Sequence, residues 1–506
     1  MKISSSRLQA LHTSPNEAAL VRCQMALELK DRGDYNAAQK VMGPLWLNVG
    51  ERPVITGLHP SVSAEVLLSV GILTRWIGSK NQVEGAQEIA KNLITESITA
   101  FELSGDVLKV AAARVELAQC YWREGALNEA RILLTESLQK LTTEGNTRAA
   151  ALHALAVIEW SASKYEEALR ILTENASLFK KITNNTIKGT YHNQLALVLR
   201  KLAPSEKRSV HFADILQQYK EADHHFKLAR NVVFRADVKN NIGFLLYQLS
   251  RFKEAHKFLE QARRLRSSVK DKVGIAQIDD TRAQVFIAEK KFKQAETVAR
   301  NAVRILEKSG HQCLLADALI TQGIALARSE HSEPAQFIFQ KAIEVAHQVG
   351  ALNKAGLAAV TMMEELDDLP PDTLYAAYDR ASEWLAKSQS QDILWRLNAV
   401  SKTILVKLRT QVGTEVVVVE DPIEALFNKP CDLQGEVLKF EGRVIQRALA
   451  KANGSLTRAA ASLSMSYQAL AYILESRQKD LLKDRTPIRR RARKGSAASP
   501  QESEQA

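Results

Sequence analysis

Residues 117–134 read LAQCYWREGALNEARILL, and this stretch decides the fold. It predicts a helix with the small residue Ala118 in the middle of one face, a tight turn at Gly125, and a second helix. In the second helix a large apolar residue, Leu127, stands three positions before an alanine, Ala130. In most other copies of this pattern the large residue is aromatic.

The same arrangement recurs along most of the chain. The recognisable copies are Ala26 with Tyr35 and Ala38, Ala156 with Tyr165 and Ala168, Gly243 with Phe252 and Ala255, Ala283 with Phe292 and Ala295, and Gly323 with Ala335 and Phe339. Two helices can cross closely only where alanine or glycine sits at the contact, and the aromatic and leucine side chains then fill the space between pairs. From 255 to 295 to 335 the alanine recurs every 40 residues.

These residues resemble the tetratricopeptide repeat, with helices longer than its usual period of about 34 residues implies. The resemblance implies an all-α fold, namely a tetratricopeptide-like α-solenoid, or superhelical array of helix pairs. We expect a short segment at 1–14 and then the array over 15–410, with about eight or nine pairs. A capping helix from Leu394 to Leu408 is expected to end the array.

The concave face of such an array is expected to hold a protein or peptide. Asn193 and Asn240 fall at equivalent positions of successive copies, where similar peptide-sensing regulators hold a ligand backbone with asparagine amides. An alternative is a scaffold with ordinary polar residues on that face. First-helix residues expected to line it are Trp122, His153, Trp160, Asn193, Arg200, Asn240 and Tyr247.

A second pattern occupies residues 440–474, FEGRVIQRALAKANGSLTRAAASLSMSYQALAYIL. It predicts a long helix that ends at Asn453 and Gly454, a short helix capped by Thr457, a turn over 464–466, and a third helix capped by Ser466. In the long helix, one face is expected to carry Val437, Phe440, Val444, Ile445, Ala448 and Leu449.

This stretch resembles the Fis-type helix-turn-helix of the enhancer-binding activators, and the resemblance covers roughly 436–480. It implies a small helical domain over 435–482, after a linker at 411–434 and before a basic, then disordered, tail at 483–506. The linker contains a β-branched run at 412–420, read as extended chain or a lone edge strand, and a short helix at 423–427.

In such motifs the third helix lies in the major groove while the preceding helix contacts phosphates. Carried over by position, Thr457 and Arg458 fall on phosphate-contact sites. Ser466, Tyr467, Gln468, Ala471 and Tyr472 fall on the exposed face of the reading helix. That face lacks the usual arginine and lysine, so the alternative is a motif retained for dimerisation or protein binding.

The charge of the chain is concentrated at this end. The formal net charge is +12, and residues 436–495 hold 14 Lys or Arg against 5 acids, which gives +9. A local basic excess indicates a polyanion as a partner, and its position directly after a nucleic-acid motif favours double-stranded DNA over a tail that is merely solvated. The tail residues Arg489, Arg490 and Arg491 are therefore expected to contact phosphates.

Other classes of protein are disfavoured. The four cysteines lie far apart and are expected to be reduced and mostly buried. We find no signal peptide, no apolar run long enough for a bilayer, and no phosphate-loop, dinucleotide or metalloprotease pattern. We therefore expect a cytoplasmic, nucleoid-associated bacterial transcription regulator that is no enzyme, needs no cofactor and has no membrane partner. It can form a homodimer through the 437–452 helix. The alternative is a repeat adaptor that binds proteins without specific DNA binding.

Overall fold

The computed structural model describes residues 14–203, 208–386, 388, 391–411 and 432–484. It divides into two compact units, Met1–Val412 and Gly413–Ala506, and each unit is described by itself. The described residues form 23 α-helices and no strand, so the prediction of an all-α chain is confirmed. The expected strand or linker at 412–420, the helix at 423–427 and the tail from 485 lie outside the described residues.

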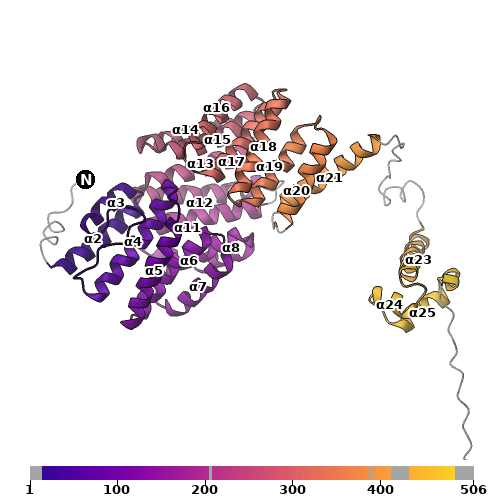
Figure 1. Ribbon diagram of the computed structural model, residues 1–506, viewed down its shortest axis with the longest axis horizontal. Helices are drawn as coiled ribbons and strands as arrows, with labels where there is room; N and C mark the ends of the chain where they lie inside the picture. The colour runs from indigo at the N-terminus through magenta and orange to yellow at the C-terminus, as the bar shows by residue number, and fades with distance from the viewer. Residues whose placement is uncertain (1–13, 204–207, 387, 389–390, 412–431, 485–506) are drawn as a thin grey trace, which may run out of the picture. The chain divides into compact units, whose positions relative to one another are not determined.

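The first unit is an array of antiparallel helix pairs (Figure 1). Nine pairs, a short extra helix (α10) after the fourth pair and a final helix are present among the described residues, and the number of pairs agrees with the expected eight or nine. The helices are α2 (Pro15–Asp31), α3 (Tyr35–Met42), α4 (Pro60–Asn81), α5 (Ala86–Leu103), α6 (Val107–Arg123), α7 (Leu127–Lys140), α8 (Asn146–Ser161), α9 (Tyr165–Glu174), α10 (Ala176–Lys181), α11 (Asn185–Leu202), α12 (Arg208–Leu228), α13 (Val232–Gln248), α14 (Phe252–Ser268), α15 (Lys272–Ala288), α16 (Phe292–Leu306), α17 (Gln312–Ala327), α18 (Ser332–Gln348), α19 (Leu352–Glu365), α20 (Pro371–Leu385) and α21 (Gln391–Gln411).

The later pairs repeat every 40 residues. Helices α13, α15, α17 and α19 begin at residues 232, 272, 312 and 352. The alanines used to find this period, Ala255, Ala295 and Ala335, are each 0% exposed. Every one of these helices is 14–17 residues long, which accounts for a period longer than 34.

Short turns of three to five residues join the helices in this part of the array. At the end of α14, Lys270 has the left-handed φ of 55°, and the amide of Asp271 donates to the carbonyl of Arg266 at 3.0 Å. This closes the helix end with a Schellman-type bond. The side chain of Asp271 then accepts from the amide of Gly274 at 2.9 Å and caps α15, so one short turn ends one helix and starts the next.

Glycine allows the closest helix crossings, as the sequence pattern predicts. A Cβ added at Gly243 would lie 2.6 Å from Leu259, and one added at Gly323 would lie 2.7 Å from the ring of Phe339. Both distances are too short for a real side chain. Glycine at these positions therefore lets α13 pack on α14 and α17 pack on α18.

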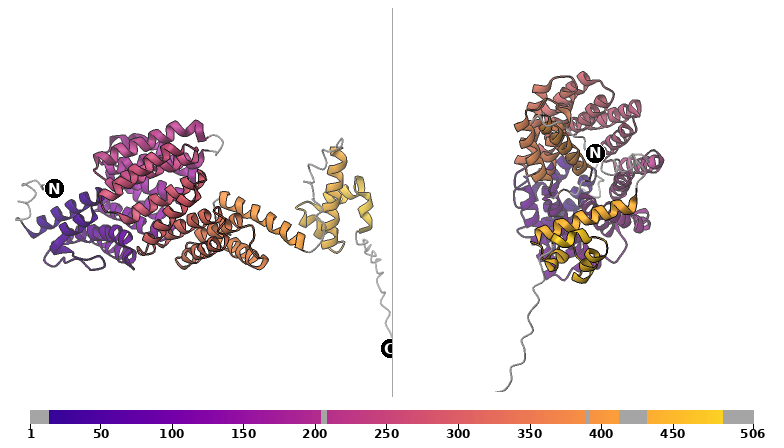
Figure 2. Two further views of the ribbon diagram at one scale, coloured as in Figure 1. Left: turned by 90° about the horizontal axis from the view of Figure 1, so that it is seen from above. Right: turned by 90° about the vertical axis from the view of Figure 1, so that its right-hand side faces the viewer.

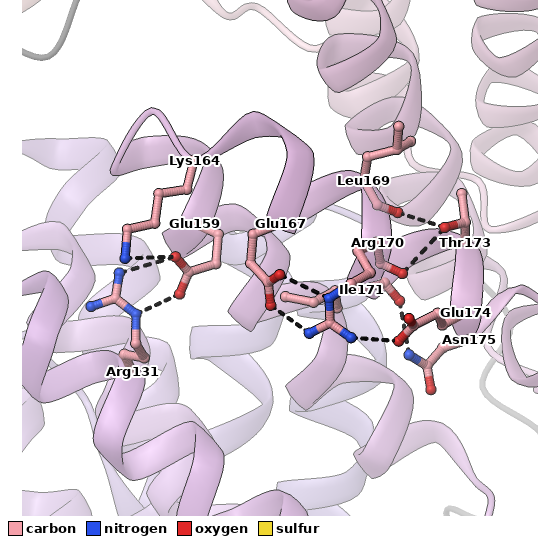
Figure 3. Close-up of polar contacts among 10 residues, drawn as sticks. All are labelled: Arg131, Glu159, Lys164, Glu167, Leu169, Arg170, Ile171, Thr173, Glu174 and Asn175. Atoms are coloured by element: carbon pink, nitrogen blue, oxygen red, sulfur yellow. Dashed lines mark hydrogen bonds and ion pairs between the residues drawn. The ribbon is translucent and has the colours of Figure 1, made fainter.

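Ion pairs connect neighbouring helix pairs of the array. Figure 3 shows Arg131 of α7 reaching Glu159 of α8, with Nε–Oε1 and Nη2–Oε2 distances of 2.5 and 3.1 Å. On α9, Arg170 bridges Glu167 and Glu174 within the same helix. The Glu159 side chain is only 5% exposed, so the two-pronged arginine contact offsets the cost of burying its charge.

The beginning of the array contacts its middle. Asp31, at the end of α2, accepts from the Asn184 side chain at 3.0 Å, and its carbonyl accepts from Thr186 and Asn231 at 3.0 and 2.9 Å. We call these four residues the Asp31 clasp. Farther along, the His311 ring lies 3.0 Å from the Lys80 carbonyl. The first and middle pairs of the array are therefore in contact, and Figure 2 shows the array from two further sides.

One described helix differs from the expectation that no apolar run could span a bilayer. Helix α4 is long and apolar enough by length and composition, with a mean hydropathy of 1.2 over its best window. However, 72% of that window is buried inside the array. Its apolar residues pack on α2, α5 and α6, so we assign it as a core helix of the solenoid.

Two of the three described cysteines are buried, in agreement with the expectation of mostly buried thiols. Cys23 and Cys120 are buried, and burial raises the pKa of each thiol to about 11. Cys313 is exposed near the start of α17. These three are free thiols, and Cys431 lies outside the described residues.

Candidate nucleic-acid interface and groove pockets

The second unit is a three-helix module. Its helices are α23 (Leu433–Lys451), α24 (Leu456–Ser462) and α25 (Tyr467–Ser476), followed by a 3₁₀ turn, η4 (Lys479–Asp484). Ser464 has φ of 56° and turns the chain between α24 and α25, and the Ser466 hydroxyl accepts from the Ala469 amide at 3.1 Å. The predicted turn and the Ser466 cap are confirmed.

The cap of α24 is not the predicted one. The helix begins at Leu456 with Ser455 at the N-cap, so Thr457 is its second residue and is exposed. The prediction placed the cap two residues too late, although serine is at least as good an N-cap as threonine, and the Ser455 side chain makes no capping hydrogen bond.

The core of the module comes from all three helices. Leu449, Ala459, Leu470 and Leu474 are each 0% exposed and form one cluster with Ile445. The predicted single apolar face of α23 is wrong. Val437, Phe440 and Val444 are 58%, 63% and 38% exposed, because they lie about 100° around the helix from the Ile445 face.

The predicted DNA-contact residues lie on α24 and α25. Tyr467, Gln468 and Tyr472 are exposed on α25, with Tyr472 72% exposed, and Ala471 is half-buried. Arg458 is exposed, but its Nη2 donates to the Ala452 carbonyl at 3.1 Å. This guanidinium therefore closes the end of α23 as well as facing solvent. Arg489, Arg490 and Arg491 lie outside the described residues.

A row of exposed basic residues on α23 was missed by sequence reasoning. Lys439, Arg443, Arg447 and Lys451 are spaced by four residues, and all are exposed. The i to i+4 spacing places them along one side of the helix. The spacing itself was the signal that could have found them. Residues 432–484 carry 8 basic and 6 acidic residues, a net of +2, so this row holds half of the basic charge.

Two pockets open on the inner side of the array. The first, of about 320 Å³, includes the predicted residues Trp122 and His153. Burial lowers the pKa of His153 to about 4, which keeps its ring neutral. The rest of its lining comes from α2, α3, α4, α6, α8, α11 and α13, so the Asp31 clasp closes one side.

The second pocket, of about 420 Å³, lies along α13, α15, α17 and α19 and includes the predicted residues Asn240 and Tyr247. Asn240 Oδ1 and Asp280 Oδ1 are buried there without a hydrogen-bond donor. Burial raises the pKa of Asp280 to about 6. Asn240 and Asp280 are both the ninth residue of their helices, and sequence reasoning missed Asp280 although it continues the Asn193 and Asn240 series.

The remaining predicted groove residues make contacts inside the array. Asn193 accepts from the side chain of Asn241 at 3.1 Å, and Arg200 lies 5.0 Å from the ring centroid of Phe244. Trp160 packs in the core of its repeat, and its Nε1 is buried without a partner. The two pockets described above are not lined by these three residues. Among the described residues, no group of three His, Cys, Asp or Glu is placed to hold a metal.

The second unit matches a known protein family. A family model described as bacterial regulatory protein, Fis family, matches residues 437–475. A comparison with curated proteins found no match.

Three solved structures are similar to the array. They are a signal transduction ATPase with a tetratricopeptide repeat sensor from Pyrococcus horikoshii (12% identity, TM-score 0.47, 74% of this chain and 55% of that one), a Rap protein complexed with Competence and Sporulation Factor (12%, 0.46, 68% and 99%), and yeast Tom70 (13%, 0.43, 83% and 86%). The chain thus spans little more than half of the ATPase. On the matched residues and the helix-turn-helix geometry, residues 437–475 form a Fis-type helix-turn-helix domain, joined in this chain to a tetratricopeptide-like array.

Proposed function

We propose that the chain is a cytoplasmic, bacterial DNA-binding transcription regulator whose repeat array binds a protein or peptide that modulates the C-terminal helix-turn-helix. The observation that carries the proposal is the Fis-family match over a folded module with an exposed α25. The basic row on α23 and the six Lys or Arg at 485–494 add attraction for a polyanion. We propose no catalytic activity and no cofactor.

Specificity and affinity are assigned to different residues. Gln468 is exposed on α25 and can pair with adenine, while Tyr467 and Tyr472 can contact thymine methyl groups. Phosphate contacts are assigned to Arg447 and the tail arginines. Arg458 is a less informative probe, because its substitution also removes the hydrogen bond to the Ala452 carbonyl.

A salt titration with random duplex DNA tests the DNA proposal. We expect a steep decrease of affinity with salt, and replacing Arg489, Arg490 and Arg491 by alanine should reduce the slope by roughly 0.9 per lost phosphate contact. The matched control replaces the exposed Arg304 of the array, which should leave the slope unchanged. Absence of binding at low salt would instead favour the protein-binding adaptor.

A sequence selection separates specific from non-specific binding. We expect bound sequences from a random duplex pool to share a motif that Gln468→Ala alters. Arg447→Ala should weaken binding to all duplexes about equally. A pool with no enriched motif would leave only the phosphate contacts.

We further propose a homodimer through α23. The stripe formed by Leu433, Val437, Phe440 and Val444 is 71%, 58%, 63% and 38% exposed, and its spacing of four, three and four residues is that of a helix-pairing seam. Such an apolar stripe on a soluble surface favours burial against a second copy. Paired modules would present two copies of α25 to successive half-sites.

The array is proposed to hold its partner by the second pocket. Asn240 Oδ1 and Asp280 Oδ1 are acceptors that lack donors, and a peptide backbone supplies N–H groups at regular spacing. Selection from a random peptide library on the full chain tests this role. Binders should be enriched on the unmodified chain and lost from Asn240→Ala, and an absence of enriched peptides would contradict it.

A further inference from the structure

The first pocket is organised around Trp76 of α4. Its ring stacks on Tyr35 with centroids 5.9 Å apart and lies 6.3 Å from the ring of Phe234 on α13. Two guanidinium groups flank the same indole, that of Arg75 at 5.2 Å and that of Arg123 at 5.3 Å from its centroid. Aromatic walls and two cations therefore occupy one concave site.

The charges of this pocket do not cancel. Lys30 pairs with Asp31 at 2.9 Å, and Arg75 pairs with Glu116 at 2.7 Å. Arg123 contacts the rings of Trp76 and Trp122 but has no carboxylate partner among the described residues. The Arg123 side chain is exposed to solvent. Partial desolvation by the groups around it and the charge of Arg75 lower its pKa, and it stays charged at neutral pH.

The unpaired polar atoms of the lining are donors. Arg75 is 1% exposed, and its Nε and Nη1 donate to no acceptor in the described residues. The Nε1 of Trp76 is also buried without an acceptor. In contrast, both carboxylate oxygens of Asp31 are engaged, by Lys30 and Asn184. A ligand that satisfies this site must bring acceptors and negative charge.

We propose that this pocket binds a carboxylate carried on an apolar body of about the size of a phenylalanine side chain. The carboxylate pairs with Arg123, and the apolar body packs on Trp122, Val157 and Ile187. Arg75, whose guanidinium lies 5.2 Å from the Trp76 centroid, adds positive potential. The site rests on the proposed ligand-binding role of the array and names the chemistry of one ligand group.

A cationic ligand fits this pocket less well. Aromatic cages bind cations through ring faces, but here Arg75 and Arg123 already lie over Trp76. A further positive charge would add repulsion in a site that is already net positive. The volume of about 320 Å³ is at the lower end of ordinary ligand pockets, which suits one small group.

Calorimetric titration of the full chain tests the site with three probes. N-acetyl-L-phenylalanine carries a carboxylate as at a peptide C-terminus, phenylacetate is a free aromatic acid, and N-acetyl-L-phenylalaninamide is the neutral match of the first. We expect at least one acid to bind, and the amide to bind at least about tenfold more weakly than its acid. Tighter binding of N-acetyl-L-phenylalanine identifies a peptide terminus, and tighter binding of phenylacetate identifies a free acid.

Substitutions of Arg123 test whether this residue pairs with the ligand carboxylate. Arg123→Gln should weaken the acid by about tenfold or more, whereas Arg123→Lys should keep part of the affinity. Arg304→Gln, which removes an exposed arginine of α16, is the matched control and should bind as the unmodified chain does. Circular dichroism checks folding, and if Arg123→Gln does not fold, the comparison of acid and amide on the unmodified chain decides.

The proposal is overturned if the amide binds as tightly as the acid, if folded Arg123→Gln retains full affinity, or if neither acid binds at millimolar concentration. These readouts are independent of DNA. All lining residues belong to the first unit, so failure of the helix-turn-helix to bind duplexes would not change them.

Discussion

Replacing Phe440 by alanine tests how two copies of the chain associate. Phe440 lies at the centre of the exposed stripe on α23, between Val437 and Val444. It makes no contribution to the core of its own module, which is formed by the Ile445 and Leu449 side of the helix. The substitution should therefore weaken a dimer and leave the folded monomer intact.

The exposed fraction sets the size of the effect. Full burial of a phenylalanine side chain contributes about 3 kcal/mol. Since 63% of Phe440 is exposed in the monomer, its burial in a dimer can contribute about 2 kcal/mol per copy. A symmetric dimer contains two copies, so the loss is about 4 kcal/mol, or a dissociation constant raised several hundredfold.

Sedimentation equilibrium of the full chain over a range of concentrations measures the constant. Tyr375→Ala is the matched control, because Tyr375 is an aromatic residue on α20 with a similar exposure of 62%. It should leave association unchanged. The reasoning is refuted if the unmodified chain stays monomeric at high concentration, or if Phe440→Ala associates as strongly as the control.

Three further changes probe the array. Asp280→Asn should stabilise the array at pH 7 by up to about 3 kcal/mol, because burial raises the pKa of Asp280 to about 6 in the folded state. The carboxyl has a lower pKa in the unfolded state, so the folded state loses stability as pH rises from about 4 to 6. The gain in unfolding free energy, measured with urea, should therefore be smaller at pH 5 than at pH 7. Asn231→Ala should lower the free energy of unfolding by about 1–2 kcal/mol, since the side chain caps α13 by accepting from the Phe234 amide and donates to the Asp31 carbonyl. An unchanged melting temperature would contradict a stabilising role of the Asp31 clasp. Gly323→Val should lower the free energy of unfolding by about 1–3 kcal/mol, because the new side chain clashes with Phe339. The control Ala376→Val, on an exposed face of α20, should lower it by less than about 1 kcal/mol. Equal urea midpoints for the two variants would argue against a close helix crossing at Gly323.

Local signals made much of the fold predictable. The alanine spacing at 255, 295 and 335 gave the helix pairs and their period, because small residues mark the crossings. Ser466 was identified as a cap because its hydroxyl suits that position, and the structure has this bond. Both signals act within one helix pair or one turn, where sequence distance and spatial distance agree.

Contacts between segments that are far apart in the sequence could not be predicted from the repeat pattern. Nothing near Asp31 indicates that Asn184 and Asn231 lie beside it, since superhelical closure sums small rotations over several pairs. The division of α23 into a buried and an exposed apolar face was missed for a related reason. Periodicity shows that a side chain is apolar, but the packing of α24 and α25 determines which apolar residues they cover.

All seven predicted groove residues lie on first helices. Trp122, His153, Asn240 and Tyr247 line the two pockets, whereas Trp160, Asn193 and Arg200 do not. Arg75 was not predicted, because a single arginine in an apolar helix gives no sign that its pairing will be incomplete.

The Asp31 clasp has a consequence for how the chain folds during synthesis. In most repeat arrays each unit contacts only its neighbours, so units can fold as they leave the ribosome. Here Asp31 meets Asn231 across 200 residues, and Lys80 meets His311 across 231. The first pair can therefore form its helices early but must wait for residue 231 before its contacts are complete, and the second pair must wait for residue 311. Closure of such long loops is slow, so the N-terminal pairs should be the last part of the array to gain protection from hydrogen exchange.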